Sequence, residues 1–382
     1  MEWKEVRLGD ILNFRRGHDL PHSSMKPGNI PVAGSNGVIG YHDTATPIKP
    51  ILTIGRSGNV GKPYFYEEAW AHNTTLYVDD FKGNDPKFLY YLCQTMPFAN
   101  FGGGSAVPTL NRNHIHPLET KIPVKVEDQR RIASILSSLD RKIELNNKIN
   151  ADLEEMAQAI FKNWFVDFEP FKDGKFVDSE LGMIPEGWKV GRADDFYQIN
   201  IGKTPPRKEH KWFSTNPADK IWVSIANMGN SGIFISDSSE YLTKEAVDSY
   251  NIIMVPRNTI LLSFKLTVGR VAIADKELTT NEAIARFILS DDKYMEYLYL
   301  YLKNFDYNSL GSTSSIATAV NSKTIKGMQM LQPSDKIIDA FHIQVNPIFE
   351  KIRSLTKENS RLSLLRDTLL PRLMSGEIEV PE

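Results

Sequence analysis

The stretch DQRRIASILSSLDRKIELNN, from Asp128 to Asn147, predicts a helix and decides how the chain is organised. It contains no Gly or Pro, and its apolar residues recur three and four positions apart. This spacing places them on one face of an α-helix. The pattern continues to about Phe165, far beyond the length of an ordinary helix. We therefore expect one long amphipathic helix in the interior of the chain, with a globular segment on each side.

The apolar residues of this helix follow a seven-residue repeat, which is typical of a coiled-coil seam. The main row is Ile132, Leu139, Asn146, Leu153 and Ile160, and a second row holds Ile135, Ile143, Ile149, Met156 and Trp164. A similar seam lies near the C-terminus, with Phe341, Ile348, Leu355, Leu362 and Leu369 in one row and Val345, Ile352 and Leu373 in the other. The sequence therefore predicts two long helices of the same kind.

Polar residues and one proline interrupt these seams. Asn146 lies in the first seam and Asn359 in the second. A buried asparagine at such a position can fix the register of two helices, and a partly exposed asparagine is the alternative. Pro347 has no counterpart in the first helix. We expect it to kink the second helix or to mark its true start.

The chain also repeats itself outside the helices. Val60-Gly61-Lys62 corresponds to Val268-Gly269-Arg270, and an asparagine follows each glycine twelve positions later, at Asn73 and Asn281. KFLYYLCQ from Lys87 matches EYLYLYLK from Glu296, and VPTLNRNHI ends at Ile115 as ATAVNSKTI ends at Ile325. Matches that occur in the same order at a nearly constant offset indicate an internal duplication.

The duplication gives the expected domain boundaries. Residues 1–125 and 188–333 form two similar mixed α/β domains, with short strands such as PILTIG, TLYVDD, TILLSF and ARFILS and one aromatic helix each. Residues 126–167 form the central helix and residues 334–382 the C-terminal helix. Residues 168–187, which are rich in Gly, Pro and acid, form a linker. The expected fold class is α+β.

Two long amphipathic helices need an apolar partner, and the simplest partner for each is the other. An internal repeat favours a pseudo-two-fold axis, which sets the helices antiparallel and returns the C-terminus to the neighbourhood of Met1. Such a scaffold holds two similar domains at a fixed spacing. This arrangement suits a target with two sites, such as duplex DNA read about one turn apart.

Composition limits the remaining possibilities. The 382 residues are 41% hydrophobic and 24% charged, as in a folded protein. Cys93 is the one cysteine, which excludes a disulfide framework and a CxxC zinc pair. The N-terminal MEWKEVRLGD has no apolar signal region, and no run of about 18 apolar residues occurs. We therefore expect a cytoplasmic protein without a membrane span.

Three segments carry a resemblance to a known family. They are IPVKVEDQRRIASILSSLDRKIELNNKINADLEEMAQAIFKNWF, the junction SELGMIPEGWKVG and the tail RDTLLPRLMSGEIEV. The chain resembles, over its whole length, the specificity subunit of type I restriction-modification systems. The resemblance implies two target recognition domains that each read one half of a bipartite sequence in double-stranded DNA. It also implies spacer helices and no catalysis by this chain.

The resemblance further implies partners. These are methyltransferase (modification) subunits, with two as the expected number, and restriction subunits that cut DNA. No cofactor is expected on this chain, whereas S-adenosylmethionine, ATP and Mg are expected on the partner subunits. Two other functions stay open: a self-contained DNA-modifying enzyme with a diverged active site, and a coiled-coil assembly adaptor that does not touch DNA.

Motifs for catalysis or metal binding are incomplete. DPKF, at Asp85–Phe88, has Lys87 where a methyltransferase tetrad needs a second proline, and FGGGS, from Phe101, has Ser105 where a cofactor loop needs glycine. His114 and His116 would share a face on a strand, but the sequence clusters no further ligands around them. We therefore expect no catalytic and no metal site.

The two domains are mildly basic although the whole chain has a net charge of −2. Residues 1–125 hold 13 Lys or Arg against 11 Asp or Glu, and residues 188–333 hold 17 against 15. Arg and Lys read guanine, and Asn reads adenine, in the major groove. Each candidate taken alone is also typical of a solvated surface. The DNA-binding candidates are Arg15, Arg16, Asn36, Arg56, Lys62, Asn111, Arg112, His114, Lys203, Arg207, Lys208, Lys211, Lys265, Arg270, Asn321 and Lys323.

An aromatic run ends the central helix, in IFKNWFVDFEPF, and LLPRLMSGEI lies at the matching end of the second helix. These segments hold more apolar side chains than a pair of helices can bury. Packing against the second domain is one interpretation, and a docking patch for a partner subunit is the other. The docking candidates are Trp164, Phe165, Leu370 and Leu373.

Overall fold

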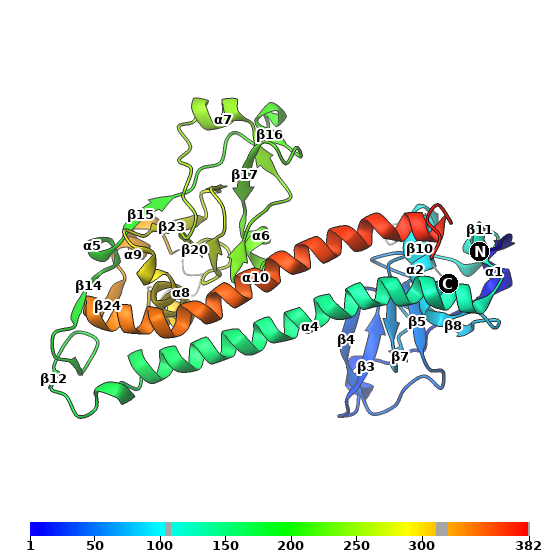
Figure 1. Cartoon of the computed structure of the whole chain (residues 1–382), viewed down its shortest axis with the longest axis horizontal. Coiled ribbons are helices and arrows are strands. Elements are labelled where there is room, and N and C mark those ends of the chain that lie inside the picture. Colours follow the sequence, from blue (N-terminus) through cyan, green and yellow to red (C-terminus); the bar gives the residue numbers. More distant parts are fainter. Residues whose placement is uncertain (104–107, 311–319, 381–382) are drawn as a thin grey trace. The chain divides into compact units, whose positions relative to one another are not determined.

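The computed structural model describes residues 1–103, 108–310 and 320–380. Ser105 and the first residues of the repeated segments at Val107 and Ala317 lie outside the described residues. The chain forms two compact units, residues 1–145 with 359–382 and residues 146–358. Each unit therefore contains one mixed α/β domain and parts of both long helices (Figure 1).

The first unit is built on a four-stranded antiparallel sheet with the order β2-β8-β5-β6. Its strands are β2 (Asn13–Arg16), β8 (Thr75–Asp80), β5 (Ile51–Gly55) and β6 (Pro63–Tyr66). A second sheet has the order β4-β3-β7 and contains β3 (Ile30–Gly34), β4 (Gly37–His42) and β7 (Trp70–Ala71). The helices of this domain are α1 (Leu8–Ile11), α2 (Pro86–Thr95) and α3 (Arg112–Ile115).

The two chain ends lie in this first unit (Figure 1). Strand β1 (Trp3–Arg7) pairs with β11 (Glu119–Pro123), and β9 (Gly102–Gly103) pairs with β10 (Thr109–Leu110). The N-terminal amine of Met1 lies 3.6 Å from the carboxylate of Glu379. Gly376 packs against the ring of Trp3. The expected return of the C-terminus to Met1 is therefore confirmed.

The second unit repeats this sheet with one strand more. Its order is β15-β23-β20-β21-β18, from the strands β15 (Gln198–Ile201), β23 (Ile284–Ile288), β20 (Ile260–Ser263), β21 (Val271–Ala274) and β18 (Phe234–Ile235). A second sheet joins β16 (Phe213–Ser214), β19 (Tyr241–Leu242), β17 (Lys220–Val223) and β22 (Thr279–Thr280). The remaining strand pairs are β14 (Lys189–Arg192) with β24 (Gln329–Gln332), and β12 (Phe176–Val177) with β13 (Ile184–Pro185).

The helices of the second unit also correspond to those of the first. They are α5 (Ala193–Phe196), α8 (Met295–Asn304) and α9 (Ser322–Lys326), together with α6 (Ile225–Asn230) and α7 (Lys244–Ser249), which have no counterpart among the described residues of the first unit. The four strands and two aromatic helices predicted from the sequence are thus confirmed at β5, β8, β20, β23, α2 and α8.

Hydrogen bonds at one turn show how closely the two repeats agree. In the first, the N–H of Gly55 donates to Lys62 O at 3.1 Å and that of Gly61 to Gly55 O at 2.8 Å. In the second, Ser263 donates to Arg270 O at 2.9 Å and Gly269 to Ser263 O at 3.0 Å. Gly61 and Gly269 both have positive φ, at 79° and 89°, a conformation that favours glycine. The predicted correspondence of these turns is confirmed.

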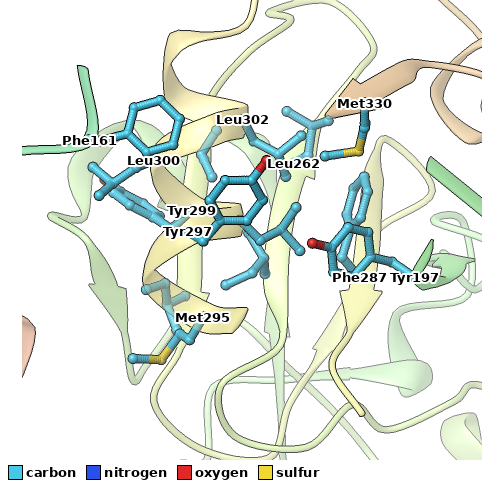
Figure 2. Packing of buried hydrophobic residues seen from close by; sticks show 14 of the residues in the cluster. Phe161, Tyr197, Leu262, Phe287, Met295, Tyr297, Tyr299, Leu300, Leu302 and Met330 are labelled. Atoms are coloured by element: carbon cyan, nitrogen blue, oxygen red, sulfur yellow. The ribbon is translucent and has the colours of Figure 1, made fainter. Parts of the chain in front are cut away.

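A continuous apolar core holds the second domain to the helices of its unit. Figure 2 shows Tyr297, Leu300 and Leu302 of α8 lying between Phe161 on one side and Leu262 and Phe287 of the sheet on the other. All of these side chains are at most 3% exposed. Burial of this kind stabilises by about 25 cal/mol for each Å² of apolar surface. The helices are therefore part of the core of the domain rather than separate from it.

The two long helices are α4 (Val126–Phe165) and α10 (Asp335–Met374), each of 40 residues. Both predicted helices are confirmed. In the second unit Asn146 of α4 donates from Nδ2 to Glu358 of α10 at 2.9 Å, and Phe165 of α4 packs on Phe341 at 4.8 Å between ring centroids. Residue numbers rise along one helix as they fall along the other, so the two segments run antiparallel.

The predicted seams need two corrections. Met156 is 53% exposed, whereas the neighbouring Ala157 is buried, because an α-helix drifts away from a strict seven-residue repeat. Pro347 does not mark the start of α10, which begins at Asp335. Proline has no N–H, so Pro347 leaves the carbonyl of Ile343, four residues earlier, without its helical donor. The side chain of Ile343 is 74% exposed, so water has access to this turn.

Short helical turns complete the chain. They are η1 (His22–Ser24), η2 (Phe98–Phe101), η3 (Glu169–Phe171), η4 (His210–Trp212), η5 (Asp292–Tyr294) and η6 (Tyr307–Leu310). The predicted linker at 168–187 contains η3 and the β12–β13 hairpin. The boundary between the two compact units lies within both long helices.

Candidate nucleic-acid interface

Four of the predicted arginines line one pocket of about 430 Å³ in the first unit. Arg15 and Arg16 come from β2, Arg56 directly follows β5, and Arg112 begins α3. The lining is completed by Leu76, Thr109, Leu110 and Asn111, and contains no Asp or Glu. Residues that are distant in the sequence therefore converge on one strongly cationic hollow.

Backbone contacts bring these segments together. The N–H of Arg56 donates to Thr74 O of the neighbouring chain segment at 2.8 Å, and its own carbonyl accepts from the N–H of Leu110 at 2.7 Å. The guanidinium of Arg112 donates from Nη1 to Phe14 O at 3.2 Å. Phe14 is fully buried and anchors β2 in the core. The pocket is thus fixed by the sheet and not by a free loop.

Carboxylates outside the lining hold two of the arginines. Arg16 lies 3.1 Å from Asp19, and Arg15 lies 3.8 Å from Asp79. Both arginines are more than half exposed, so these pairs contribute little free energy and leave the guanidinium groups accessible. Within the described ranges of the chain, Arg56 has no ion pair. A half-buried guanidinium without a carboxylate favours binding of an anionic ligand.

Asp19 is a supporting residue that the sequence reasoning missed. It accepts from the side chain of Asn73 as well as pairing with Arg16. The three-residue spacing from Arg16 to Asp19 was a usable signal. His116 is a second missed residue, because its Nε2 accepts from the N–H of Phe14 at 3.1 Å and so positions β2.

The second domain has different residues at the positions equivalent to these four arginines. Gly17 and Gly202 correspond, since each donates its N–H to the adjacent strand segment, to Thr75 O at 3.0 Å and to Ile284 O at 3.1 Å. Arg15 and Arg16 therefore correspond to Asn200 and Ile201. At the matching turns Arg56 corresponds to Phe264, and in the matching helices α3 and α9 Arg112 corresponds to Ser322. None of these four counterparts is cationic.

Cations of the second domain instead gather on aromatic rings. The Arg207 guanidinium lies 4.3 Å from the ring centroid of Phe213 and 4.4 Å from that of Trp222, and it pairs with Glu240 at 2.6 Å. Lys211 lies 4.2 Å from the ring of Trp212 and 3.6 Å from Glu209. Stacking of this kind orients a cation without burying its charge. We call Arg207, Lys211, Trp212, Phe213 and Trp222 the aromatic–basic cluster.

Lys203 is bound to the backbone nearby. Its ammonium donates to Tyr250 O at 3.2 Å and to Asn251 O at 3.3 Å. Lys208, Lys265 and Lys323 are exposed, as are Asn36 in the turn between β3 and β4 and His114 on α3. These positions fit a contact with a ligand and equally fit a solvated surface.

The matched pair Lys62 and Arg270 has one backbone setting but two side-chain settings. Lys62 is exposed and lies 5.4 Å from the ring of Tyr64. Arg270 is half-buried, and its Nη1 donates to Ile225 O at 2.7 Å. Its guanidinium also packs against Gly229, where a Cβ atom would lie 2.3 Å from it. Lys62 is free to meet a ligand, whereas Arg270 has a structural partner.

Asn111 and Asn321 are equivalent in structure as predicted, and both cap a helix. Asn111 Oδ1 accepts from the N–H of Asn113 at 2.9 Å, and Asn321 Oδ1 accepts from those of Lys323 and Thr324 at 2.9 and 3.0 Å. A two-bond contact with adenine needs the amide oxygen as an acceptor. The cap already engages that oxygen, so the structure gives both residues a structural role first.

Two of the four predicted docking residues, Phe165 and Leu373, are buried in the cores. Phe165 is 5% exposed and packs on Tyr297 and Phe341, with 4.8 Å between ring centroids in each case. Leu373 is 2% exposed, and Trp164 and Leu370 are partly buried against the same cores. The aromatic run holds more apolar side chains than a pair of helices can bury, and the second domain covers the remainder. Phe165 and Leu373 therefore present no surface to a partner.

Metal chemistry finds no support within the part of the chain that the structure describes, which contains no group of three His, Cys, Asp or Glu able to hold an ion. His114 lies on helix α3 and His116 is its C-terminal capping residue, so the two do not lie on a strand. Burial lowers the pKa of His116. The described helices include none that is long and apolar enough to cross a membrane.

Comparisons with known proteins agree on one family. The model of the type I restriction modification DNA specificity domain matches residues 1–155 and 185–342. The type I restriction enzyme MjaIX specificity subunit of Methanocaldococcus jannaschii is 32% identical over 78% of this chain and 70% of its own length. The HindI specificity subunit of Haemophilus influenzae is 28% identical over 98% of this chain and 94% of its own length.

A solved structure has the same fold. The S subunit of a type I restriction-modification system from M. genitalium superposes with a TM-score of 0.62 at 15% identity, covering 98% of this chain and 96% of that one. Members of this family are the non-catalytic subunits that give type I enzymes their DNA specificity. Because the family model covers both repeats, the chain belongs to the family of type I restriction-modification specificity subunits.

Proposed function

We propose that the chain reads a bipartite DNA sequence, one half-site for each of its two repeated domains. The observation that carries this proposal is the pocket lined by Arg15, Arg16, Arg56 and Arg112, which we call the arginine pocket and whose lining has no carboxylate. Arginine is the side chain that most often pairs with guanine edges and with phosphates. The equivalent positions of the second domain differ in chemistry, as expected if each domain reads its own sequence.

The long helices act in this proposal as an antiparallel coiled-coil spacer related by a pseudo-two-fold axis. Support comes from their equal length of 40 residues and from the contacts that pair them in opposite directions. In the first unit Arg366 of α10 meets Asp140 of α4 at 2.9 Å. The buried Asn146, paired with Glu358, would fix the register of the two helices.

The chain would work within a larger complex. Family membership supports assembly with methyltransferase subunits, of which we expect two, and with restriction subunits. S-adenosylmethionine, ATP and Mg would then be bound by those partners, because catalysis is theirs. A role on host DNA implies the cytoplasm as the place of action. Neither a self-contained modifying enzyme nor an adaptor that avoids DNA is favoured by a specific observation.

Selection of DNA by the purified chain tests the proposal. The chain, with its methyltransferase subunit, would be incubated with random duplexes, and the bound fraction would be sequenced. We expect two short specified segments separated by a gap of fixed length and unspecified sequence. One contiguous motif, or binding without any motif, would contradict the proposal.

A further inference from the structure

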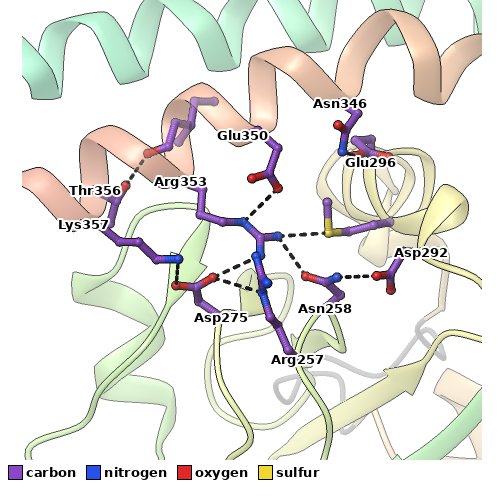
Figure 3. Close-up of polar contacts among 12 residues, drawn as sticks. Arg257, Asn258, Asp275, Asp292, Glu296, Asn346, Glu350, Arg353, Thr356 and Lys357 are labelled. Carbon is purple, nitrogen blue, oxygen red and sulfur yellow. Dashed lines mark hydrogen bonds and ion pairs between the residues drawn. The ribbon is translucent and has the colours of Figure 1, made fainter.

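A buried arginine ties helix α10 to the second domain. Arg353 is 2% exposed. Its Nη1 donates to Asp275 at 3.1 Å and its Nη2 to Asn258 at 2.8 Å (Figure 3). The Met295 sulfur lies 3.5 Å from the guanidinium and the ring centroid of Phe234 lies 4.3 Å from it. A buried guanidinium is stable only when its donors are paired in this way.

Further charges complete this arrangement, which we call the arginine clasp. Asp275 also lies 3.2 Å from Lys357 and 3.6 Å from Arg257, and Glu350 lies 3.2 Å from Nε of Arg353. Beside it the buried Glu296 of α8 accepts from Asn346 of α10 at 2.9 Å and meets His342 at 2.7 Å. Figure 3 shows Asp275, Glu350 and Arg353 between α10 and the loops of the second domain.

The same place in the first repeat can be found residue by residue. The two matching turns relate β6 to β21 by 208 positions, so Glu67 corresponds to Asp275. Helices α2 and α4 are related to α8 and α10 by 209 positions, since α4 begins at Val126 and α10 at Asp335. By this relation Glu144 corresponds to Arg353. The remaining equivalents are Lys87 for Glu296, Ser137 for Asn346, Arg141 for Glu350 and Pro86 for Met295.

In the first repeat this place is an open pocket. It has a volume of about 580 Å³ and is lined by Pro50, Phe65, Glu67, Asp85, Pro86, Lys87, Ser137, Asp140, Arg141 and Glu144. The lining thus includes the counterparts of Arg353, Asp275, Glu350, Glu296, Asn346 and Met295. Where the second repeat places a guanidinium, the first places the carboxylate of Glu144. The first repeat therefore lacks the guanidinium that fills this place in the second.

The charge of the pocket is suited to a cation. Four carboxylates line it against two basic side chains. Asp140 is bound to Tyr91 at 2.5 Å and to Arg366 at 2.9 Å, and Lys87 rests 4.0 Å from the ring of Phe65. Across residues 1–103, 108–310 and 320–380 neither the Glu67 nor the Glu144 side chain has an ion pair or a hydrogen bond. Two carboxylates are thus free to receive a cation.

We propose that this pocket receives an arginine side chain from a methyltransferase subunit. The equivalent place in the second repeat is closed to such a side chain because Arg353 fills it. The proposal rests on the proposed function, which supplies the partner. Arginine is favoured over lysine because a guanidinium holds the equivalent place in the second repeat beside Asp275, whose counterpart Glu67 keeps the carboxylate. One such contact per chain would make the two repeats unequal toward otherwise identical partners.

Peptide binding tests the pocket itself. Three tripeptides, acetyl-Gly-X-Gly-amide with X as arginine, lysine or neutral citrulline, would be titrated into the full chain and followed by NMR. We expect saturable binding of the arginine peptide, weakened at least fivefold by Glu144→Gln or Glu67→Gln. Glu155→Gln, which removes an exposed carboxylate of α4 outside the pocket, should leave binding unchanged.

Three results would overturn the proposal at this stage. They are the absence of saturable binding of the arginine peptide, equal binding by the wild type and Glu144→Gln, and equal binding of the lysine and arginine peptides. The last result would remove the assignment to arginine in particular.

Assembly tests the partner. Glu144→Arg supplies a guanidinium from within the chain and should lower the affinity for the methyltransferase subunit at least tenfold. The affinity of the isolated chain for DNA should not change, because the arginine pocket is built from other residues. Unchanged assembly would refute the proposal. If the wild-type chain showed no sequence-specific DNA binding, the proposed function would be refuted instead. The two failures are therefore distinguishable.

Discussion

The two repeats of this chain share a common arrangement of strands, turns and helix caps but not their side-chain chemistry. The sheets run in the same order, the turns at Gly61 and Gly269 have the same hydrogen bonds, and Asn111 and Asn321 cap equivalent helices. Yet Arg15, Arg16, Arg56 and Arg112 face one pocket in the first repeat, and their counterparts carry no positive charge. Two domains that recognise different DNA sequences require a similar backbone with different side chains at the contact positions.

The surface against the long helices differs in a second way. In the second repeat the arginine clasp fills the space between helix and domain, whereas in the first repeat the space is open. Both arrangements hold a domain of the same fold. The difference therefore shows that the clasp is not needed to specify the fold, and that each repeat has its own means of fixing its helix.

The largest expected effect concerns the clasp. Arg353→Met should lower the free energy of unfolding by about 3 kcal/mol, because it leaves the buried Asp275 with only the half-exposed Lys357 and Arg257 and removes the donor to Asn258. Glu144→Met, the equivalent change in the first repeat, should alter it by at most about 0.5 kcal/mol because Glu144 is exposed. Urea unfolding of both variants measures this. Equal losses of unfolding free energy in the two variants would show that the repeats do not differ at these positions.

A smaller difference is expected at the matched turns. Arg270→Ala should cost about 1–3 kcal/mol of stability, because the half-buried Ile225 carbonyl loses its donor. Lys62→Ala should leave stability unchanged and instead weaken DNA binding, with a salt dependence flattened by about one charge if Lys62 meets a phosphate. Thermal unfolding and binding at two salt concentrations separate these outcomes. Loss of stability in both variants would contradict the contrast.

The smallest contrast is expected at the helix caps, where the repeats should behave alike. Asn111→Ala and Asn321→Ala should each lower the free energy of unfolding by about 1 kcal/mol, because each removes an amide oxygen that accepts a backbone N–H. Asn111→Asp and Asn321→Asp serve as controls, since aspartate keeps the acceptor. If either alanine variant changed the recognised DNA sequence without losing stability, these residues would instead be assigned to contacts with DNA bases.

The helices and the duplication were predictable because their signals are local or periodic. A stretch without Gly or Pro and with apolar residues three and four apart predicts a helix wherever it occurs, and α4 and α10 confirm this. The repeat appeared as matched motifs such as those at Gly61 and Gly269. The strands followed from short apolar runs between turn residues.

Burial and long-range pairing were not predictable in the same way. Phe165 is covered by Phe341 and Tyr297, which lie more than a hundred positions further along the chain. The partners Arg353 and Asp275 are 78 positions apart, and no local pattern links them. The sequence also listed Arg56 and Arg112 among sixteen candidates without indicating that they share a pocket, since that depends on the hydrogen bond between Leu110 and Arg56.

The central claim is that the domains read their half-sites independently, the first through its arginine pocket. The most direct measurement compares the wild type with Arg56→Ala on duplexes altered in one half-site at a time. The account predicts that Arg56→Ala costs about 1–3 kcal/mol of binding and relaxes one half-site only, with the other still fully discriminated. Equal relaxation of both half-sites, or unchanged discrimination in both, would contradict it.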